Sequence, residues 1–192
     1  MNIVAIIGTA GRDKSRPTSQ LLWSRMYKAA KWQLECWFPE NDYSLVSGGA
    51  ALADHIAVGI HLVTHRPIQL FIPCLWDKEF HQYNDAGNSD WRMNPGKTAN
   101  FYHREFSRVL TNGLAPNHSL ETLHDKVFLP GYMKVGNGFH GRNRMIADIC
   151  THMIAFTWGL NGPCDGGTKH TWDLAQSKIR VHISLQSLAT SP

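Results

Sequence analysis

Residues 3–11 of the chain read IVAIIGTAG. An unbroken apolar run such as Ile3–Ile7, ending in a glycine, is typical of a strand that is buried on both faces of a parallel sheet. Glycine at the end of such a strand permits a tight turn and lets the backbone approach a bound anion closely. The segment therefore predicts both the first strand of an α/β fold and one candidate ligand-binding turn.

The rest of the chain alternates between strand-like and helix-like patterns. Further strands are predicted at 43–46, 68–75, 153–157 and 180–185, and helices at about 18–38, 51–64, 141–150 and 166–177. Alternating strands and helices form βαβ units, so we expect a Rossmann-like, doubly wound parallel sheet of about five strands with helices on both faces. Ligands of such sheets bind beyond the carboxyl ends of the strands.

Residues 77–138 interrupt this alternation after the third strand. We expect a long polar loop over 77–96, a helix over 98–111, a short helix capped by Ser119, and a glycine-rich loop over 129–138. The chain is thus interpreted as one domain, 1–192, with a largely helical and loop insertion over 77–138 and a short polar tail. The insertion is a candidate lid because it carries or adjoins the aromatic residues Tyr83, Trp91, Phe101 and Tyr102.

Composition narrows the class of protein. With 192 residues, 43% of them apolar and 18% charged, the chain resembles a globular protein and not a disordered, collagen-like or disulfide-stapled one. The net charge of +4 is mild and no run of five basic residues occurs, which argues against a nucleic-acid partner. The N-terminus lacks the pattern of a signal peptide, and no apolar run has the ~18 residues of a membrane helix. We therefore expect no membrane partner and a cytoplasmic location.

Three glycine-rich turns each follow a predicted strand and precede a predicted helix. Their candidate ligand-binding residues are Gly8, Thr9 and Gly11 in the first turn, Ser47, Gly48 and Gly49 in the second, and Gly166, Gly167 and Thr168 in the third. In a parallel sheet all three turns lie at one rim, where backbone N–H groups and helix N-termini favour phosphate. The spacing is neither that of the dinucleotide fingerprint nor that of a P-loop, so ordinary dehydrogenase and ATPase sites are excluded.

Several side chains near these turns are candidates for ligand contact. Arg12 follows the first turn, and the pair Arg142–Asn143 lies at a predicted helix start. A guanidinium suits phosphate, and the amide of Asn143 suits a sugar or a base. Trp76 and Trp158 lie at strand ends, where an indole ring can stack on a base.

Asp54 is the candidate catalytic residue, because cleavage of a glycosidic bond requires a carboxyl group near the anomeric carbon. An equally weighted alternative is that Asp54 complements the dipole of its helix or binds a neighbouring loop. Glu79 and Asp85 of the insertion are further carboxylates, whereas Asp165 is interpreted as a turn residue.

A metal site is not expected. His61 and His65 have the i, i+4 spacing of two ligands on one helix face, but no HExxH motif accompanies them. Histidine near the C-terminus of a helix is favourable without a metal. We expect neither a metal nor a cofactor.

The order of three motifs resembles that of the SLOG superfamily, which unites DNA-processing proteins, Lonely Guy phosphoribohydrolases and YpsA-like proteins. The motifs are Gly48-Gly49-Ala50-x-x-x-Asp54, Arg142-Asn143 and Gly166-Gly167-Thr168, and the resemblance to the small YpsA-like branch covers residues 1–76 and 139–185. It implies a Rossmann-like fold that binds a nucleotide or a nucleotide-derived ligand. In the Lonely Guy enzymes an Arg and a Glu after the third turn support N-glycosidic cleavage; here Thr171 stands three residues past Thr168, and the next acid is Asp173.

Three functions fit this combination. We expect a protein that senses or sequesters a phosphorylated, nucleotide-derived small molecule, because binding alone needs no acid after Thr168. The alternatives are a nucleoside-monophosphate N-glycosidase, which leaves open whether the chain is an enzyme, and a protein that binds single-stranded nucleic acid. Trp23, Trp32 and Trp37 on the predicted first helix are compatible with a homodimer.

Overall fold

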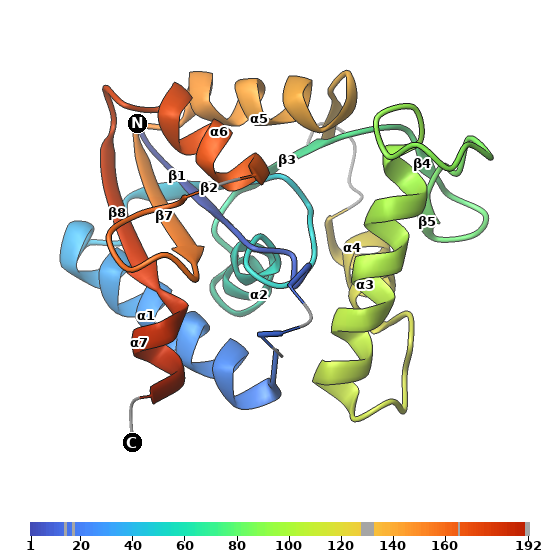
Figure 1. Cartoon of the computed structure of the whole chain (residues 1–192). Coiled ribbons are helices and arrows are strands. Elements are labelled where there is room, and N and C mark those ends of the chain that lie inside the picture. The colour runs from blue at the N-terminus through green and yellow to red at the C-terminus, as the bar shows by residue number, and fades with distance from the viewer. Residues whose placement is uncertain (14, 17, 128–132, 165, 191–192) are drawn as a thin grey trace.

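The parallel sheet at the centre of the molecule is visible in a computed structural model that describes residues 1–13, 15–16, 18–127, 133–164 and 166–190 (Figure 1). Its strands lie in the order β6-β3-β2-β1-β7-β8, and each neighbouring pair is parallel. Their bounds are β1 Asn2–Gly8, β2 Tyr43–Ser47, β3 Ile68–Ile72, β6 Met133–Val135, β7 His152–Thr157 and β8 Ile179–Ser184. The predicted Rossmann-like α/β class is confirmed, with one strand more than the expected five.

The first strand is buried on both faces, as its sequence predicts. Val4 and Ile6 belong to one core cluster, and Ala5 and Ile7 belong to a second cluster on the opposite face of the sheet. This division follows from the alternation of side chains along a strand.

Helices cover both faces of the sheet (Figure 1). On one side lie α1 Gln20–Trp37, α2 His55–Thr64 and α7 Leu185–Thr190; on the other lie α5 Gly138–Ile149 and α6 Gly166–Leu174. The α1 helix begins where the Ser19 hydroxyl caps the N–H of Leu22, and its buried residues recur every four positions, ending with Leu34. No helix in the described ranges is long and apolar enough to cross a membrane.

The strand order reverses between β1 and β7. From β1 the chain proceeds outward through β2 and β3 to β6, and then α5 returns it to β7 on the other side of β1. In open α/β sheets, ligands bind beyond the carboxyl ends of the strands at such a reversal. The first two glycine-rich turns begin at this end of the sheet, after β1 and β2.

The segment between β3 and β6 forms a separate layer at one side of the sheet (Figure 1). It contains the short antiparallel pair β4 Trp76–Asp77 and β5 Gln82–Tyr83, followed by α3 Pro95–Thr111 and α4 His118–Val127. Asn94 caps α3 through its side chain, and Pro95 occupies the first turn, where its missing N–H costs nothing. We refer to the described residues from 76 to 127 as the insertion layer.

Several details differ from the sequence-based predictions. The α2 helix begins at His55 and not at residue 51, so Asp54 precedes it, and α5 begins at Gly138, so Arg142 and Asn143 lie in its second turn and not at its start. Met133–Val135, within the predicted loop 129–138, forms β6; its largely exposed side chains give no apolar pattern. The predicted loop 77–96 contains part of a strand pair. Ser119 lies inside α4 with a buried side chain and does not cap it, and the expected polar tail begins with helix α7.

Candidate functional site

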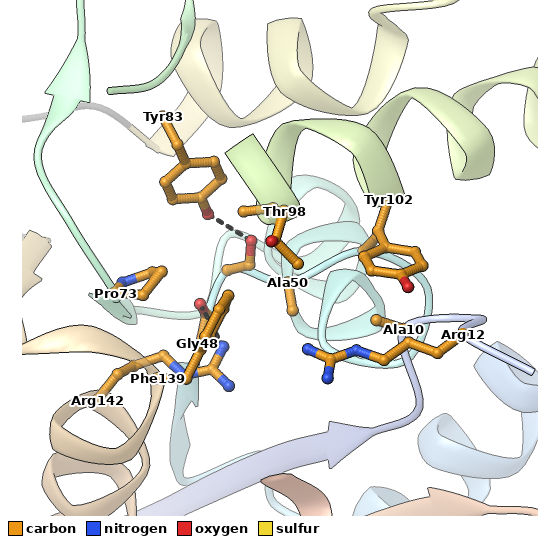
Figure 2. Close-up of a pocket in the computed structure, with 13 residues that line it drawn as sticks. Ala10, Arg12, Gly48, Ala50, Pro73, Tyr83, Thr98, Tyr102, Phe139 and Arg142 are labelled. Carbon is orange, nitrogen blue, oxygen red and sulfur yellow. Dashed lines mark hydrogen bonds between the residues drawn. The ribbon is translucent and has the colours of Figure 1, made fainter. Parts of the chain in front are cut away.

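The first and second glycine-rich turns meet α3 and the start of α5 around one pocket, which we call the rim pocket (Figure 2). It contains about 300 Å³ of free space, including its mouth. Its lining residues are Ala10, Arg12, Gly48, Gly49, Ala50, Ala51, Pro73, Tyr83, Thr98, Ala99, Tyr102, Phe139 and Arg142. The sequence predicted the two turns and both arginines here, whereas the part played by α3 depends on tertiary packing.

Two guanidinium groups point into the rim pocket from opposite sides (Figure 2). Arg12 is exposed, lies over the rings of Tyr102 and Phe139, and has no carboxylate partner among the described residues. Arg142 is only 9% exposed and also lies over Phe139. Burial lowers the pKa of Arg142, the nearby Asp54 and Tyr83 raise it, and the positive charge of Arg12 lowers it. The positive charges of the two arginines therefore repel each other across the pocket, and this repulsion favours the binding of an anion between them.

Asp54 lies beneath the second turn and is 3% exposed. Its Oδ2 is 3.6 Å from Nη1 of Arg142. Burial raises the pKa of Asp54, and this is opposed by the Arg142 charge and by backbone hydrogen bonds from Gly8, Ala50 and Gly48. Backbone N–H groups of both turns thus favour the charged form of this carboxyl, at the rim where we expected a ligand phosphate. In the structure Asp54 contacts Arg142 and the glycine-rich turns. These contacts correspond to the alternative interpretation, in which Asp54 binds a neighbouring loop.

The glycines of these turns allow close packing. A Cβ on Gly48 would lie 2.4 Å from Nη1 of Arg142 and 2.6 Å from Oδ2 of Asp54, and a Cβ on Gly8 would lie 2.3 Å from the carbonyl oxygen of Phe156. Ser47 is buried, and its hydroxyl accepts a hydrogen bond from the N–H of Gly49 within the same turn. The backbone of this rim is therefore held by the protein itself.

The first turn continues this internal bonding. The N–H of Thr9 donates to the carbonyl of Phe156, and the N–H of Gly11, which has φ +79°, donates to Oγ1 of Thr9. The turn thereby directs the chain so that Arg12 reaches the pocket.

Asn143 connects the second turn with the third. It is 1% exposed; its Oδ1 accepts from Nε and Nη2 of Arg142, and its Nδ2 donates to the carbonyl of Gly167. Arg142 in turn donates to the carbonyl of Gly48 at 3.0 Å. The amide that we expected to contact a sugar or base is used within the protein.

The third turn lies beside a second, smaller hollow. Gly167 and Thr168 line it together with Gly8, Asp54 and Asn143, and it contains about 200 Å³ of free space. Gly166 has φ +67° and is the first residue of α6, and Asp165 lies outside the described residues. The structure therefore brings two of the three turns to the rim pocket and the third to the other side of Arg142.

The two tryptophans expected to stack on a base do not line the rim pocket. Trp76 packs edge-on against Tyr83, and its Nε1 donates to Nδ1 of His124. Trp158 lies under the guanidinium of Arg16. The aromatic walls of the pocket are instead Tyr102 and Phe139.

Two contacts to the second turn carried no signal in the sequence. The carbonyl of Gly49 accepts from the hydroxyl of Tyr83 at 2.5 Å and bonds Nε2 of His103 at 2.9 Å. Tyr83 was expected only as part of a lid, and His103 shows no ligand spacing. Tyr83 lies 34 residues and His103 lies 54 residues from Gly49 in the sequence, so no local pattern connects them to this turn.

The remaining candidates lie away from the rim pocket. Glu79 and Asp85 are exposed in the insertion layer. The described residues contain no group of three metal-ligating side chains, and Nδ1 of His61 bonds the carbonyl of Arg66. His65 caps the end of α2 in the left-handed conformation.

Comparison with known proteins identifies a viral protein to which this chain is similar. No family model matches the chain. It is 29% identical over 195 residues to "Uncharacterized protein R261" of Acanthamoeba polyphaga mimivirus, and the alignment covers 95% of both chains. The similarity extends over the insertion layer as well as the sheet, and the name of the relative states no activity.

Proposed function

We propose that this chain binds a phosphorylated, nucleotide-derived small molecule in the rim pocket, and that it senses or sequesters a nucleotide signal. One observation carries the proposal: the guanidinium groups of Arg12 and Arg142 converge on a pocket whose described lining contains no carboxylate. Arg142 has Asp54 as its ion-pair partner, whereas Arg12 forms no ion pair with any described carboxylate, so the pocket keeps a positive charge. A phosphate can accept hydrogen bonds from a guanidinium in bidentate geometry.

The aromatic walls of the pocket suit the base of a nucleotide. Tyr102 and Phe139 both lie within cation–π distance of Arg12, so the ring faces and the positive charge adjoin one space. A base that stacks on one of these rings brings its phosphate close to the guanidinium. Stacking of this kind contributes about 1 to 3 kcal/mol per base.

The shape of the pocket favours a single small molecule. Its free space of about 300 Å³ includes the open mouth, so the enclosed part is smaller than this figure. Thr98, Ala99 and Tyr102 of α3 close one side of it. This favours a mononucleotide-sized ligand over a single strand of nucleic acid, which requires an open groove with several stacking platforms.

The arrangement favours binding over N-glycosidic cleavage. No carboxyl group belongs to the described lining of the pocket, and Asp54 is occupied by Arg142 and the backbone of the turns. Thr171, at the position of the Glu in the similar enzymes, is buried and donates to the carbonyl of Gly167. Asp173 forms an exposed pair with Lys169.

A panel of nucleoside monophosphates, NAD and ADP-ribose compounds tests the proposal. Thermal unfolding is measured with each compound, and the compounds are then separated to detect any released base. A ligand at 100 times its Kd stabilises the folded state by about 2.7 kcal/mol. A shift with unchanged ligand supports binding, release of free base supports the glycosidase, and the absence of any shift contradicts the proposal.

A further inference from the structure

The carbonyl oxygen of Gly49 is held by two side chains of the insertion layer. The Tyr83 hydroxyl donates to it from β5, and His103 Nε2 reaches it from α3. Both side chains are fully buried. One carbonyl of the second turn therefore joins the insertion layer to the rim pocket.

The hydrogen bonds of His103 fix which ring nitrogen carries the proton. A carbonyl only accepts, so Nε2 donates to Gly49. Nδ1 lies 3.0 Å from the Ser119 hydroxyl, which also lies 3.0 Å from the carbonyl of His103. Ser107 donates to the carbonyl of His103 and accepts from the N–H of Ser119. The imidazole is thus oriented by α3 and α4 together.

Tyr83 is oriented with similar completeness. Its backbone N–H donates to Oδ1 of Asn100, and its carbonyl accepts from Nδ2 of the same side chain, at 2.9 and 2.8 Å. The ring packs edge-on against Trp76. Both donors to Gly49 are therefore oriented by contacts within the insertion layer.

The insertion layer holds the peptide group between Gly49 and Ala50 through its C=O. The N–H of the same peptide group lies on the side of the Asp54 carboxylate and lowers the pKa of that carboxyl. Gly49 has φ +61°, and a Cβ there would lie 2.7 Å from the Tyr83 hydroxyl, so glycine is required for this approach. A glycine peptide that is not held can flip, and a flip here would turn the carbonyl oxygen away from its donors.

We propose that Tyr83 and His103 are positioning residues of the rim pocket, which keep the Gly49 carbonyl turned toward the insertion layer and away from a bound phosphate. This inference rests on the proposed function, because turning the carbonyl away raises the affinity of the pocket only for an anionic ligand. The two donors offset the partial negative charge of the carbonyl beside Arg12 and Arg142. The affinity of the pocket for an anion thereby depends on how the insertion layer packs against the second turn.

Amide hydrogen exchange at Ala50, measured without ligand, tests the positioning directly. The variants are Tyr83→Phe, His103→Gln and His103→Leu, and the matched control is Tyr27→Phe, which removes a hydroxyl from half-buried Tyr27 on α1. The second readout is the Kd of the tightest-binding nucleotide of the panel above. Because one net hydrogen bond is lost, Tyr83→Phe is expected to speed Ala50 exchange and to weaken binding, each by roughly 2- to 10-fold.

The other variants sharpen the outcome. His103→Gln retains an amide donor and is expected to lose less than His103→Leu, whereas Tyr27→Phe changes neither readout. Unchanged Ala50 exchange in Tyr83→Phe, or faster exchange with unchanged affinity, overturns the inference. If the wild type binds no nucleotide, the proposed function fails, and the exchange result alone decides whether Tyr83 and His103 hold the turn.

Discussion

Asp54 and Arg142 form a buried ion pair, with 3.6 Å between Oδ2 and Nη1, at the junction of the glycine-rich turns. Arg142 also donates to the carbonyl of Gly48 and to Asn143, which in turn binds Gly167. One guanidinium therefore ties the second turn to the third, and the carboxylate beneath it receives N–H groups from the first and second turns. The pair supports the rim, and Arg12 provides a second cation, which forms no ion pair with the described carboxylates.

Asp54→Asn is expected to destabilise the fold by about 3 to 5 kcal/mol, because it leaves the buried Arg142 charge uncompensated. Urea unfolding at pH 7.5 measures this, with Asp173→Asn as a control, since Asp173 forms only an exposed pair with Lys169. A catalytic Asp54 would give a different result: the Asn variant would keep its stability and lose base release.

Gly8→Ala is expected to lower the free energy of unfolding by about 1 to 3 kcal/mol, because the new methyl group meets the Phe156 carbonyl and Cβ of Ala53. Gly141→Ala is the matched control; its Cβ would meet Asn137 and Gly136 only at ordinary contact distances and would improve the helix propensity of α5. If both variants have the stability of the wild type, close packing does not explain the glycine at the end of β1.

Tyr102→Leu is expected to weaken nucleotide binding by about 1 kcal/mol or more, which is roughly fivefold, through loss of a stacking surface. Phe101→Leu is the control, because the Phe101 ring touches Tyr102 but does not line the pocket. Titration calorimetry with a nucleotide distinguishes the two. Equal losses in both variants would place the base elsewhere.

The stability of the protein is expected to fall in acid because two histidines are buried in the neutral form. Burial lowers the pKa of His55 to about 3 and that of His103 to about 4, from an ordinary value of 6.5. As pH falls below 6.5, the unfolded chain binds protons that the folded chain does not. Stability is therefore full above pH 6.5 and is lost progressively toward pH 4, by about 2 kcal/mol for each histidine at pH 5.

Urea unfolding at pH 7.5 and pH 5 measures this loss, and His55→Leu separates the two contributions. Nδ1 of His55 has no hydrogen-bond partner in the described structure, so an apolar residue is tolerated there. The variant is expected to lose about half of the acid sensitivity. A wild type equally stable at both pH values would contradict the burial of both neutral rings.

The sequence predicted the sheet because its determinants are local. The apolar run Ile3–Ile7 and the glycines after it report burial and turning without reference to distant residues, and the helix periods do the same. The predictions that failed concern structure that depends on contacts between distant residues. Met133–Val135 is a short, exposed edge strand whose existence depends on pairing with β3.

Some residues of the candidate site could likewise be predicted from the sequence, and others could not. Arg12 and the second turn were predicted because they adjoin strand ends. Phe139, and the contacts of His103 and Tyr83 with Gly49, arise only when α3 and α5 pack beside the rim. Asn143 was expected to contact a ligand, whereas its buried bonds to Arg142 and Gly167 depend on a tertiary arrangement that sequence spacing does not encode.

The most direct test of the central claim is the Kd of the tightest-binding panel nucleotide for the wild type, Arg12→Gln and Arg66→Gln. Arg66 is the matched control, because it lies over the Tyr43 ring at the start of β2, away from the carboxyl ends of the strands. Loss of a charged hydrogen bond predicts roughly 10- to 100-fold weaker binding for Arg12→Gln and no change for Arg66→Gln. Equal affinity of Arg12→Gln and the wild type would contradict a phosphate site in the rim pocket.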